Sequence, residues 1–346
     1  MKSIAPNVYH LPELATSVFD LLREYTGIFV LTDENTRQHC YPLVQDLLPR
    51  HTCFTVPAGE AYKTLDTCQK IWLEMTRQQL DRKAVCLNLG GGVIGDMGGF
   101  CAATYKRGID FLQMPTTLLS QVDASVGGKL GIDFHGLKNH LGVFQQPQRV
   151  YIFSGFLQTL PAREIRSGFA EVLKHGLIAS KSHWQKAVAA TSPGQPWAET
   201  IPESVNIKAE VVRQDPTEKG LRKILNFGHT IGHAIESYFL EKGEERLLHG
   251  EAIAIGMICE SWVSQQKGLI TAADCQQIQN HLLRFFPKQP LPENADGQLL
   301  KTIYQDKKNT GKKINCTLLK AVGEAVFDQP VTAEEITKSL RMYSQL

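Results

Sequence analysis

The sequence predicts an α/β domain with a parallel sheet, followed by a mostly α-helical domain. In the first half, short runs rich in β-branched and aromatic residues alternate with helical stretches, which is typical of βαβ units. In the second half, apolar residues recur at three- and four-residue intervals, as they do in amphipathic helices. A chain of 346 residues is also too long for one typical domain. We therefore expect two domains, at 1–157 and 158–346.

The individual elements follow from the same patterns. Strands are expected in the first half at GIFVLT, HTCFTV, AVCLNL and IDFLQMP, which cover 27–32, 51–56, 84–89 and 109–115. Helices are expected between them at 36–48, 65–80 and 93–106. In the second half, helices are expected at 162–179, 221–239, 249–266 and 272–286, and a last strand at 314–322. The stretches 192–197 and 291–297 contain proline and glycine and should be surface loops.

Composition excludes several classes of protein. The 37 basic and 35 acidic residues nearly cancel, so no global field is directed at nucleic acid or a membrane. No run of about 18 apolar residues occurs, and the start MKSIAPNVYHLPEL lacks the pattern of a secretion signal. We therefore expect a cytoplasmic protein. The eight cysteines are scattered singly, which predicts reduced thiols rather than a disulfide framework.

A glycine-rich turn follows the third expected strand. The run GGGVIGD at 90–96 connects the strand AVCLNL to a helical stretch, at the end of a parallel strand. Glycines there let the backbone approach a phosphate group, with the N–H groups of the helix start facing it. The spacing differs from GxGxxG. The turn therefore predicts either a dinucleotide site, as in a Rossmann-like nucleotide-binding domain, or only a tight strand-to-helix connection.

Acidic, basic and imidazole side chains occur at helical spacing in the second half. His229 and His233 are four residues apart and should share one helical face, and Glu171 and Lys174 are three apart on another helix. His249 begins a third helix. Two imidazoles and one carboxylate from separate helices would form a three-ligand site with open positions, as a catalytic zinc requires. For any single histidine, a core or helix-capping role is the ordinary alternative.

A further group of residues is basic or amide-bearing. Arg222 and Asn226 are four residues apart and should point the same way, and lysines can supply charge to a phosphate or carboxylate. The ordinary alternative, a solvated charged face, fits Lys307 and Lys308 well. It fits Lys129 poorly, because that residue lies in a glycine-flanked, otherwise apolar stretch. The remaining members of the group are Lys138, Asn139 and Lys208.

Taken together, these segments resemble the 3-dehydroquinate synthase family. The resemblance runs from about residue 59 to 257, and DKKNTGKK extends it towards the C-terminus. It rests on GGGVIGDMGGFCAATYKRGIDFLQMPTTLLSQVDASVGGKLGID, KNHLGVFQQP, SGFAEVLKHGLI, GLRKILNFGHTIGHAIE and LHGEAIAIGM. The sequence differs from the commoner family wording at Gly98, at Ile132-Asp133 and at His175, and none of these positions is a candidate ligand or charge.

The resemblance implies a role for each candidate residue. The metal ligands would be Glu171, His229 and His249, holding zinc or cobalt. The phosphate end of a sugar phosphate substrate would meet Lys129, Asn139, Arg222, Asn226, His233 and one of Lys307 and Lys308, with Lys138 beside Asn139. The substrate's hydroxyls and carboxylate would meet Arg107, Asp123, Lys174 and Lys208. The cofactor NAD would contact Asp33, Asn35, Glu60, Lys63, Gly92, Val93, Ile94, Gly95, Asp96, Thr116 and Thr117.

The implied activity closes 3-deoxy-D-arabino-heptulosonate 7-phosphate into 3-dehydroquinate with loss of phosphate, in a homodimer of the shikimate pathway. Three alternatives are weighed against it. Another sugar phosphate cyclase would change some substrate-binding positions, whereas Lys129, Lys208, Arg222 and Asn226 have the dehydroquinate-type identity here. A metal-dependent polyol dehydrogenase would not need the basic group. A catalytically inactive NAD-binding module would not need the intact candidate ligands.

Overall fold

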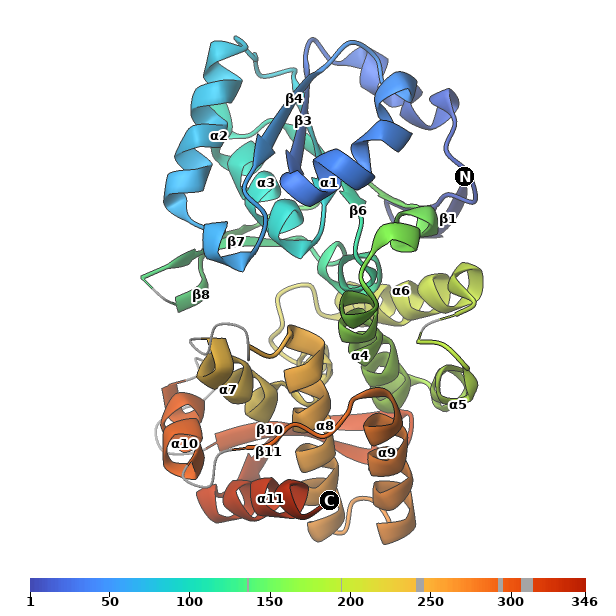
Figure 1. Ribbon diagram of the computed structural model, residues 1–346, viewed down its shortest axis with the longest axis vertical. Helices are drawn as coiled ribbons and strands as arrows, with labels where there is room; N and C mark the ends of the chain where they lie inside the picture. The colour runs from blue at the N-terminus through green and yellow to red at the C-terminus, as the bar shows by residue number, and fades with distance from the viewer. Residues whose placement is uncertain (136, 194, 241–245, 292–294, 306–313) are drawn as a thin grey trace. The chain divides into compact units, whose positions relative to one another are not determined.

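The computed structural model of the chain describes residues 1–135, 137–193, 195–240, 246–291, 295–305 and 314–346. It divides into two compact units, Met1–Pro161 and Ala162–Leu346 (Figure 1). The sequence places this boundary after residue 157. Each unit is described by itself below.

The first unit is built on a seven-stranded sheet with the order β1-β2-β9-β6-β5-β3-β4. The first two strands pair in the antiparallel direction, and all the remaining neighbouring strands pair in parallel. The strands are β1 (Lys2–Ala5), β2 (Val8–His10), β3 (Ile28–Asp33), β4 (Thr52–Val56), β5 (Val85–Gly90), β6 (Asp110–Pro115) and β9 (Arg149–Ile152). The predicted parallel α/β sheet is confirmed, and all four predicted strands belong to it.

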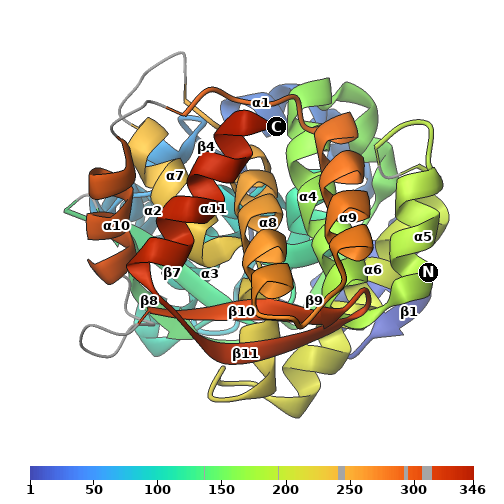
Figure 2. The same ribbon diagram turned by 90° about the horizontal axis from the view of Figure 1, so that it is seen from below.

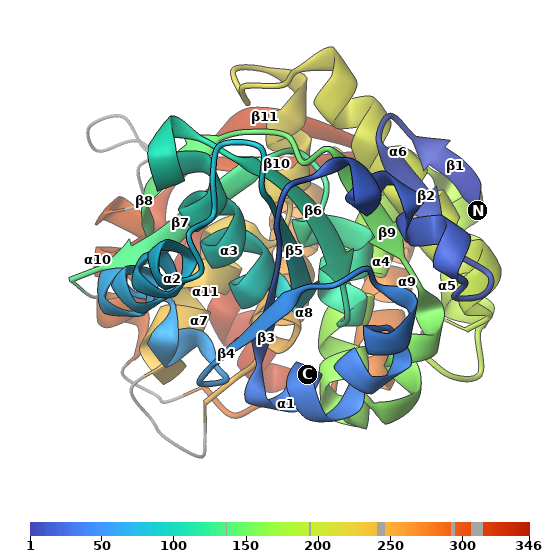
Figure 3. The ribbon, with the colours of Figure 1, turned by 90° about the horizontal axis from the view of Figure 1, so that it is seen from above.

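Helices and short turns cover both faces of this sheet. On one face, α2 (Leu65–Arg77) and α3 (Gly92–Thr104) lie side by side (Figure 3) and bury one set of alternate strand residues, among them Phe29, Leu31 and Cys86. The opposite face buries the intervening residues, among them Val30, Leu87 and Leu112. This period-2 alternation explains why strands covered on both faces read as continuous apolar runs. A hairpin of β7 (Lys129–Phe134) and β8 (Leu137–Phe144) packs against α3 and was not predicted.

Short helical turns replace the helix predicted at 36–48. Only α1 (Glu34–His39) is α-helical there, and 3-10 turns follow because Pro42 lacks an N–H and cannot continue an α-helix. The turns after α1 are η2 (Tyr41–Leu43) and η3 (Gln45–Leu47). The remaining short turns of this unit are η1 (Thr16–Glu24), η4 (Glu60–Tyr62), η5 (Tyr105–Arg107), the π-helical η6 (Ser120–Ala124) and η7 (Ser154–Thr159).

The second unit is mostly α-helical, as predicted. Its central helix is α8 (His249–Gln266), which Figure 2 shows between α9 (Ala272–Phe285) and α11 (Ala333–Gln345). The antiparallel hairpin β10 (Ile314–Ala321) and β11 (Glu324–Val331) completes it, and only β10 was predicted. The other elements are α4 (Ala162–Ala179), α5 (Lys181–Ala189), α6 (Trp197–Gln214), η8 (Leu221–Asn226), α7 (His229–Leu240) and α10 (Ala295–Gln305).

One predicted helix, at 221–239, is wrong as a single element. The chain forms the 3-10 helix η8, breaks at Phe227 and Gly228, and restarts as α7. Gly228 has a φ of 79°, a left-handed conformation that a β-branched or bulky residue would rarely adopt. The break places His229 at the first position of α7 rather than in the middle of a longer helix.

Glycines let α7 and α8 approach each other closely. A Cβ atom on Gly256 would lie 1.9 Å from the carbonyl oxygen of Gly228, and one on Gly232 would lie 2.8 Å from Ile253 Cδ1. The first contact is with backbone, so position 256 requires glycine, whereas at position 232 a larger residue would press on the end of a flexible side chain. The close crossing fixes the separation of the two helices that carry the candidate histidines.

All eight cysteines are free thiols, as predicted, and only Cys53 is not buried. Among the described residues, no helix combines the length and apolar character that crossing a membrane requires.

Candidate active site

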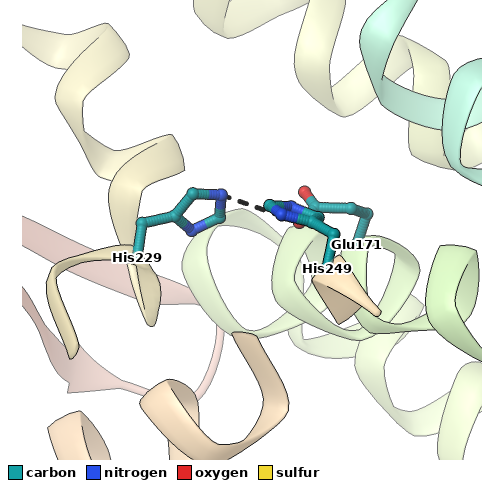
Figure 4. A group of neighbouring side chains, drawn as sticks. All are labelled: Glu171, His229 and His249. Carbon is teal, nitrogen blue, oxygen red and sulfur yellow. Dashed lines mark ion pairs between the residues drawn. The ribbon is translucent and has the colours of Figure 1, made fainter. Parts of the chain in front are cut away.

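Three candidate ligands converge in the second unit. Glu171 lies in the middle of α4, and His229 and His249 are the first residues of α7 and α8. One ligand-type atom of each lies within 4.8 Å of the other two. The Nε2 atoms of His229 and His249 are 3.8 and 3.6 Å from Glu171 Oε1, and Figure 4 shows the three side chains turned toward one another.

The other ring nitrogen of each histidine contacts an oxygen. His229 Nδ1 lies 3.0 Å from the carbonyl oxygen of Phe227, and His249 Nδ1 lies 3.3 Å from Glu236 Oε2 on α7. An oxygen at Nδ1 favours the tautomer that carries its proton there and leaves Nε2 free to ligate a metal. Both imidazoles are therefore oriented so that Nε2 faces Glu171.

Electrostatics at this cluster favour paired charges. Glu171 has no exposed surface and forms an ion pair with Lys174 one turn later on α4, as the three-residue spacing predicted. Burial alone would lower the pKa of His249, but Glu236 and Glu171 together raise it to about 10. The two carboxylates therefore favour positive charge at His249.

His233 lies beside this cluster on the same face of α7. Its ring centroid is 4.9 Å from that of His229 and 6.0 Å from that of His249, which confirms the predicted shared face. His233, Glu236 and His249 also form a group whose ligand atoms lie within 4.8 Å of one another. Geometry alone therefore permits His233 as a ligand or as a neighbour of the metal.

Arg222 and Asn226 lie on η8 and make separate contacts. The guanidinium of Arg222 is buried and donates to the carbonyl oxygen of Pro216 at 2.6 Å, whereas the Asn226 amide donates to Glu218 Oε1 at 2.8 Å. Both partners belong to the short segment 216–218 that precedes η8, so both side chains reach the same part of the chain.

A cavity of about 270 Å³ opens beside this segment. Asn226, Glu218 and Thr230 line it, together with residues of the β10–β11 hairpin. Lys208 lies on α6 and is buried. The second unit thus holds five of the residues predicted to address the substrate, namely Lys174, Lys208, Arg222, Asn226 and His233.

The predicted cofactor residues of the first unit follow the carboxyl ends of parallel strands. They end or follow β3 (Asp33, Asn35) and follow β4 (Glu60, Lys63), β5 (Gly92, Val93, Ile94, Gly95, Asp96) and β6 (Thr116, Thr117). After β4 the chain crosses β3 to form β5 on the other side, so the strand order reverses between β3 and β5. Such a switch point is where open α/β sheets bind their ligands.

The glycine run adopts the expected strand-to-helix turn. Gly91 is the N-cap of α3, and within the described part of the chain no side chain caps the first turn of that helix. A Cβ on Gly91 would lie 3.0 Å from Thr117 Cγ2, and one on Gly90 would lie 2.4 Å from Ile94 Cβ. Position 90 therefore leaves no room for a side chain and position 91 leaves little, and the N–H groups of the turn are available to an anion.

Lys63 connects three parts of the first unit. Its ammonium is buried and donates to Asp96 Oδ2 at 2.7 Å and to Asn139 Oδ1 at 2.6 Å. Its carbonyl oxygen accepts the N–H of Asp133, whose carboxylate accepts the N–H of Asn139 at 2.7 Å. Burial would lower the pKa of Lys63, but Asp96 and Glu60 outweigh it and raise the pKa above its ordinary value.

The remaining predicted substrate residues of the first unit are more accessible. Arg107 and Lys129 are exposed, at the end of η5 and the start of β7, and Asp123 is half-buried in η6. Lys138 lies 3.8 Å from Glu60. Lys307 and Lys308 lie outside the described residues.

Three acidic residues of the second unit were missed. Glu218 accepts from Asn226, Glu236 contacts His249, and Glu260 accepts backbone N–H groups at the start of α7. Of the three, only Glu236 could have been found from the sequence pattern, because it lies two helical turns after His229 and one turn after His233.

Comparison with known proteins adds to this geometry. Residues 53–167 match the family model described as 3-dehydroquinate synthase N-terminal, and residues 168–309 match 3-dehydroquinate synthase C-terminal. The 3-dehydroquinate synthase of Parabacteroides distasonis is 39% identical over 327 residues, which are 93% of this chain and 92% of that protein. That of a Sulfurovum species is 43% identical over 280 residues, 80% of this chain and 78% of that protein.

A solved structure is similar along the whole chain. ValA, a 2-epi-5-epi-valiolone synthase from Streptomyces hygroscopicus solved with NAD+ and Zn2+ bound, has a TM-score of 0.86 and 26% identity. The match covers 100% of this chain and 98% of ValA. The matched family models, the curated relatives and this fold agree with one another, and the chain belongs to the 3-dehydroquinate synthase family.

Proposed function

We propose that this chain converts 3-deoxy-D-arabino-heptulosonate 7-phosphate into 3-dehydroquinate and phosphate, using NAD and one divalent metal. The observation that carries the proposal is the convergence of Glu171, His229 and His249 from three helices in a member of this family. Carboxylate oxygen and imidazole nitrogen suit zinc and cobalt, and a three-ligand set leaves positions open for a substrate. The donor set therefore fits the metal.

The first unit fits the cofactor. The glycine turn before α3 and the residues after β3, β4 and β6 lie at the switch point of a parallel sheet, and the first turn of α3 offers N–H groups to a pyrophosphate. When bound, NAD would accept and return one hydride, and the metal would act as a Lewis acid on substrate hydroxyls. The protein's own residues would supply orientation and charge.

The protein's charges support the elimination step. Lys174 forms an ion pair with Glu171, and a neighbouring positive charge favours the carboxylate form that would ligate a metal. Oxidation of one hydroxyl makes the neighbouring C–H acidic, and loss of that proton expels phosphate, which Lys129, Arg222 and His233 would stabilise by their charge and hydrogen bonds. The substrate's own phosphate would assist as the base. Re-reduction, ring opening and an intramolecular aldol step then complete the carbocycle by positioning.

Two alternatives are less well supported. Another sugar phosphate cyclase would resemble ValA more than a dehydroquinate synthase, but the identity is 26% to ValA and 39% to the enzyme of Parabacteroides distasonis. A polyol dehydrogenase has no use for a phosphate-binding group. Redox stoichiometry distinguishes such a dehydrogenase from the synthase, because the dehydrogenase releases one reduced cofactor per turnover.

The decisive experiment counts phosphate and NADH in one reaction. With catalytic NAD and zinc or cobalt present, we expect many equivalents of inorganic phosphate per enzyme and no matching rise in absorbance of reduced nicotinamide. Chelation should stop turnover, and added metal should restore it. Stoichiometric free NADH with the substrate's phosphate still attached would refute the synthase assignment.

We also propose that the protein works in the cytoplasm as a homodimer, with a small sugar phosphate and neither nucleic acid nor membrane as its partner. The near balance of 37 basic and 35 acidic residues supports the last point. Size-exclusion chromatography with light scattering tests the dimer, and a monomer at working concentration would contradict it.

A further inference from the structure

A buried carboxylate ties the two candidate histidine helices together. Glu260 lies on α8, has no exposed surface, and directs its carboxylate at the start of α7. Its Oε2 accepts the backbone N–H of Gly228 at 2.6 Å, and its Oε1 accepts those of Thr230 at 3.1 Å and Ile231 at 3.2 Å. Three backbone donors around His229 thus end on one side chain.

This arrangement explains how a carboxylate can remain charged in the interior. A buried charge is costly unless hydrogen bonds compensate it. The first N–H groups of a helix lack intrahelical partners, and the helix dipole is positive at that end. Bonds from such donors to a carboxylate are charge-assisted and therefore stronger and more directional than bonds between neutral groups. Glu260 thereby fixes the first turn of α7.

The position of His229 depends on this turn. The preceding Gly228 has a φ of 79°, so the chain reaches His229 through a residue with wide conformational freedom. The contact of His229 Nδ1 with the carbonyl oxygen of Phe227 orients the ring only relative to the same loop. Glu260 instead connects that loop to the helix that begins at His249. The two rings lie 5.5 Å apart between centroids.

We propose that Glu260 is a positioning residue for the metal site, which sets the place of His229 Nε2 relative to His249 Nε2. It acts through the backbone N–H groups at the start of α7. The proposal rests on the metal assignment made under the proposed function. Residues that support metal ligands in this way typically change metal affinity by about ten- to hundredfold when replaced.

The test compares Glu260→Gln with Ser264→Ala in the full-length protein. Glutamine keeps the shape of the side chain and one acceptor oxygen but turns an NH₂ group toward backbone donors. Ser264 lies one turn later on α8 and is equally buried; it donates to the Glu260 carbonyl and accepts the N–H of Leu319 at 3.0 Å. Its loss perturbs the same helix without touching the start of α7.

Each metal-free protein is titrated with Co²⁺ and its visible absorption spectrum is recorded, alongside thermal melting. For Glu260→Gln we expect a Kd for Co²⁺ about ten- to hundredfold weaker than wild type and a changed cobalt spectrum. For Ser264→Ala we expect a lower melting temperature with the wild-type Kd and spectrum. If Glu260→Gln does not fold, Glu260→Asp, which keeps the charge but withdraws the oxygens, is judged by the same two readouts.

Two outcomes overturn the proposal, one by removing the positioning role of Glu260 and the other by removing the metal assignment on which it rests. A wild-type Kd and spectrum in Glu260→Gln, with only the melting temperature lowered, would show that Glu260 stabilises the fold and nothing more. If wild-type protein bound no Co²⁺, or His249→Ala bound it as tightly, the metal assignment itself would fail and the proposal with it.

Discussion

Replacing Lys63 with methionine should loosen the first unit around its candidate cofactor site. Lys63 is 3% exposed and its ammonium is the donor for both Asp96 and Asn139, so its loss leaves a carboxylate and an amide oxygen facing an apolar side chain. Breaking a buried ion pair by removing one partner costs about 3–5 kcal/mol. Asp96 is partly exposed, so water screens part of the effect, and we expect about 3 kcal/mol.

Hydrogen exchange followed by mass spectrometry is the suitable assay, because a chain of two units need not unfold in one step. Peptides covering η4, the start of α3 and the β7–β8 hairpin report on the three segments that Lys63 joins. A loss of about 3 kcal/mol corresponds to exchange faster by about two orders of magnitude in these peptides. Peptides of the second unit should exchange at the wild-type rate.

The matched control is Lys70→Met, the same substitution at an exposed position of α2. Its effect should stay within about 0.5 kcal/mol. Because the pKa of Lys63 is raised in the folded protein, its stabilising contribution is present at neutral pH and is lost only as pH rises through that raised value. Equal exchange in the two variants would refute the reasoning, since Lys63 would then contribute no more than a surface lysine.

Three further predictions concern single contacts. Glu236→Gln weakens the contact that orients His249, so the Kd for Co²⁺ should rise by about ten- to hundredfold, and an unchanged titration would contradict this. Burial would raise the pKa of Glu251, but Arg163 and a backbone N–H outweigh it and lower the pKa. The stability that this carboxylate contributes is therefore present above its ordinary pKa and is lost as pH falls through the lowered value. Arg163→Met should reduce the fall in melting temperature at acid pH, and melting temperatures that change with pH in parallel with wild type would argue against this. Gly98→Ala would place a Cβ 2.1 Å from the oxygen of a buried asparagine on β5 and should cost about 1–3 kcal/mol in urea denaturation, and wild-type stability would show that the site relaxes freely.

Several elements could be predicted because their pattern is local. The helix at 249–266 has the same bounds in sequence and structure, and four strands were found as short runs rich in β-branched and aromatic residues. The hairpin of β7 and β8 was missed, since its residues face solvent on one side and its pairing depends on contacts with α3. The break at Gly228 was missed because the apolar spacing continues through it.

The candidate ligands could be found for a different reason. Glu171, His229, His233 and His249 stand out as polar groups with metal-binding chemistry in apolar helical stretches, and the family resemblance chose the ligands among them. Their supporting residues do not stand out, because support is a matter of long-range geometry. Glu260 acts on backbone groups about thirty residues earlier in the chain, and no periodicity connects it to them. The spacing argument assumed an α-helix around Arg222 and Asn226, whereas the chain forms a 3-10 helix there.

The distribution of thiols gives the protein a built-in reporter of local opening. Five cysteines belong to the first unit (Cys40, Cys53, Cys68, Cys86 and Cys101) and three to the second (Cys259, Cys275 and Cys316), and all except Cys53 are buried. Burial raises the pKa of Cys40 to about 12 and that of Cys275 to about 11, so neither forms a reactive thiolate at neutral pH while folded. A thiol reagent therefore modifies Cys53 first. Modification of any buried cysteine requires the unit that contains it to open, and peptide mapping of the modified cysteines reveals which of the two units opened.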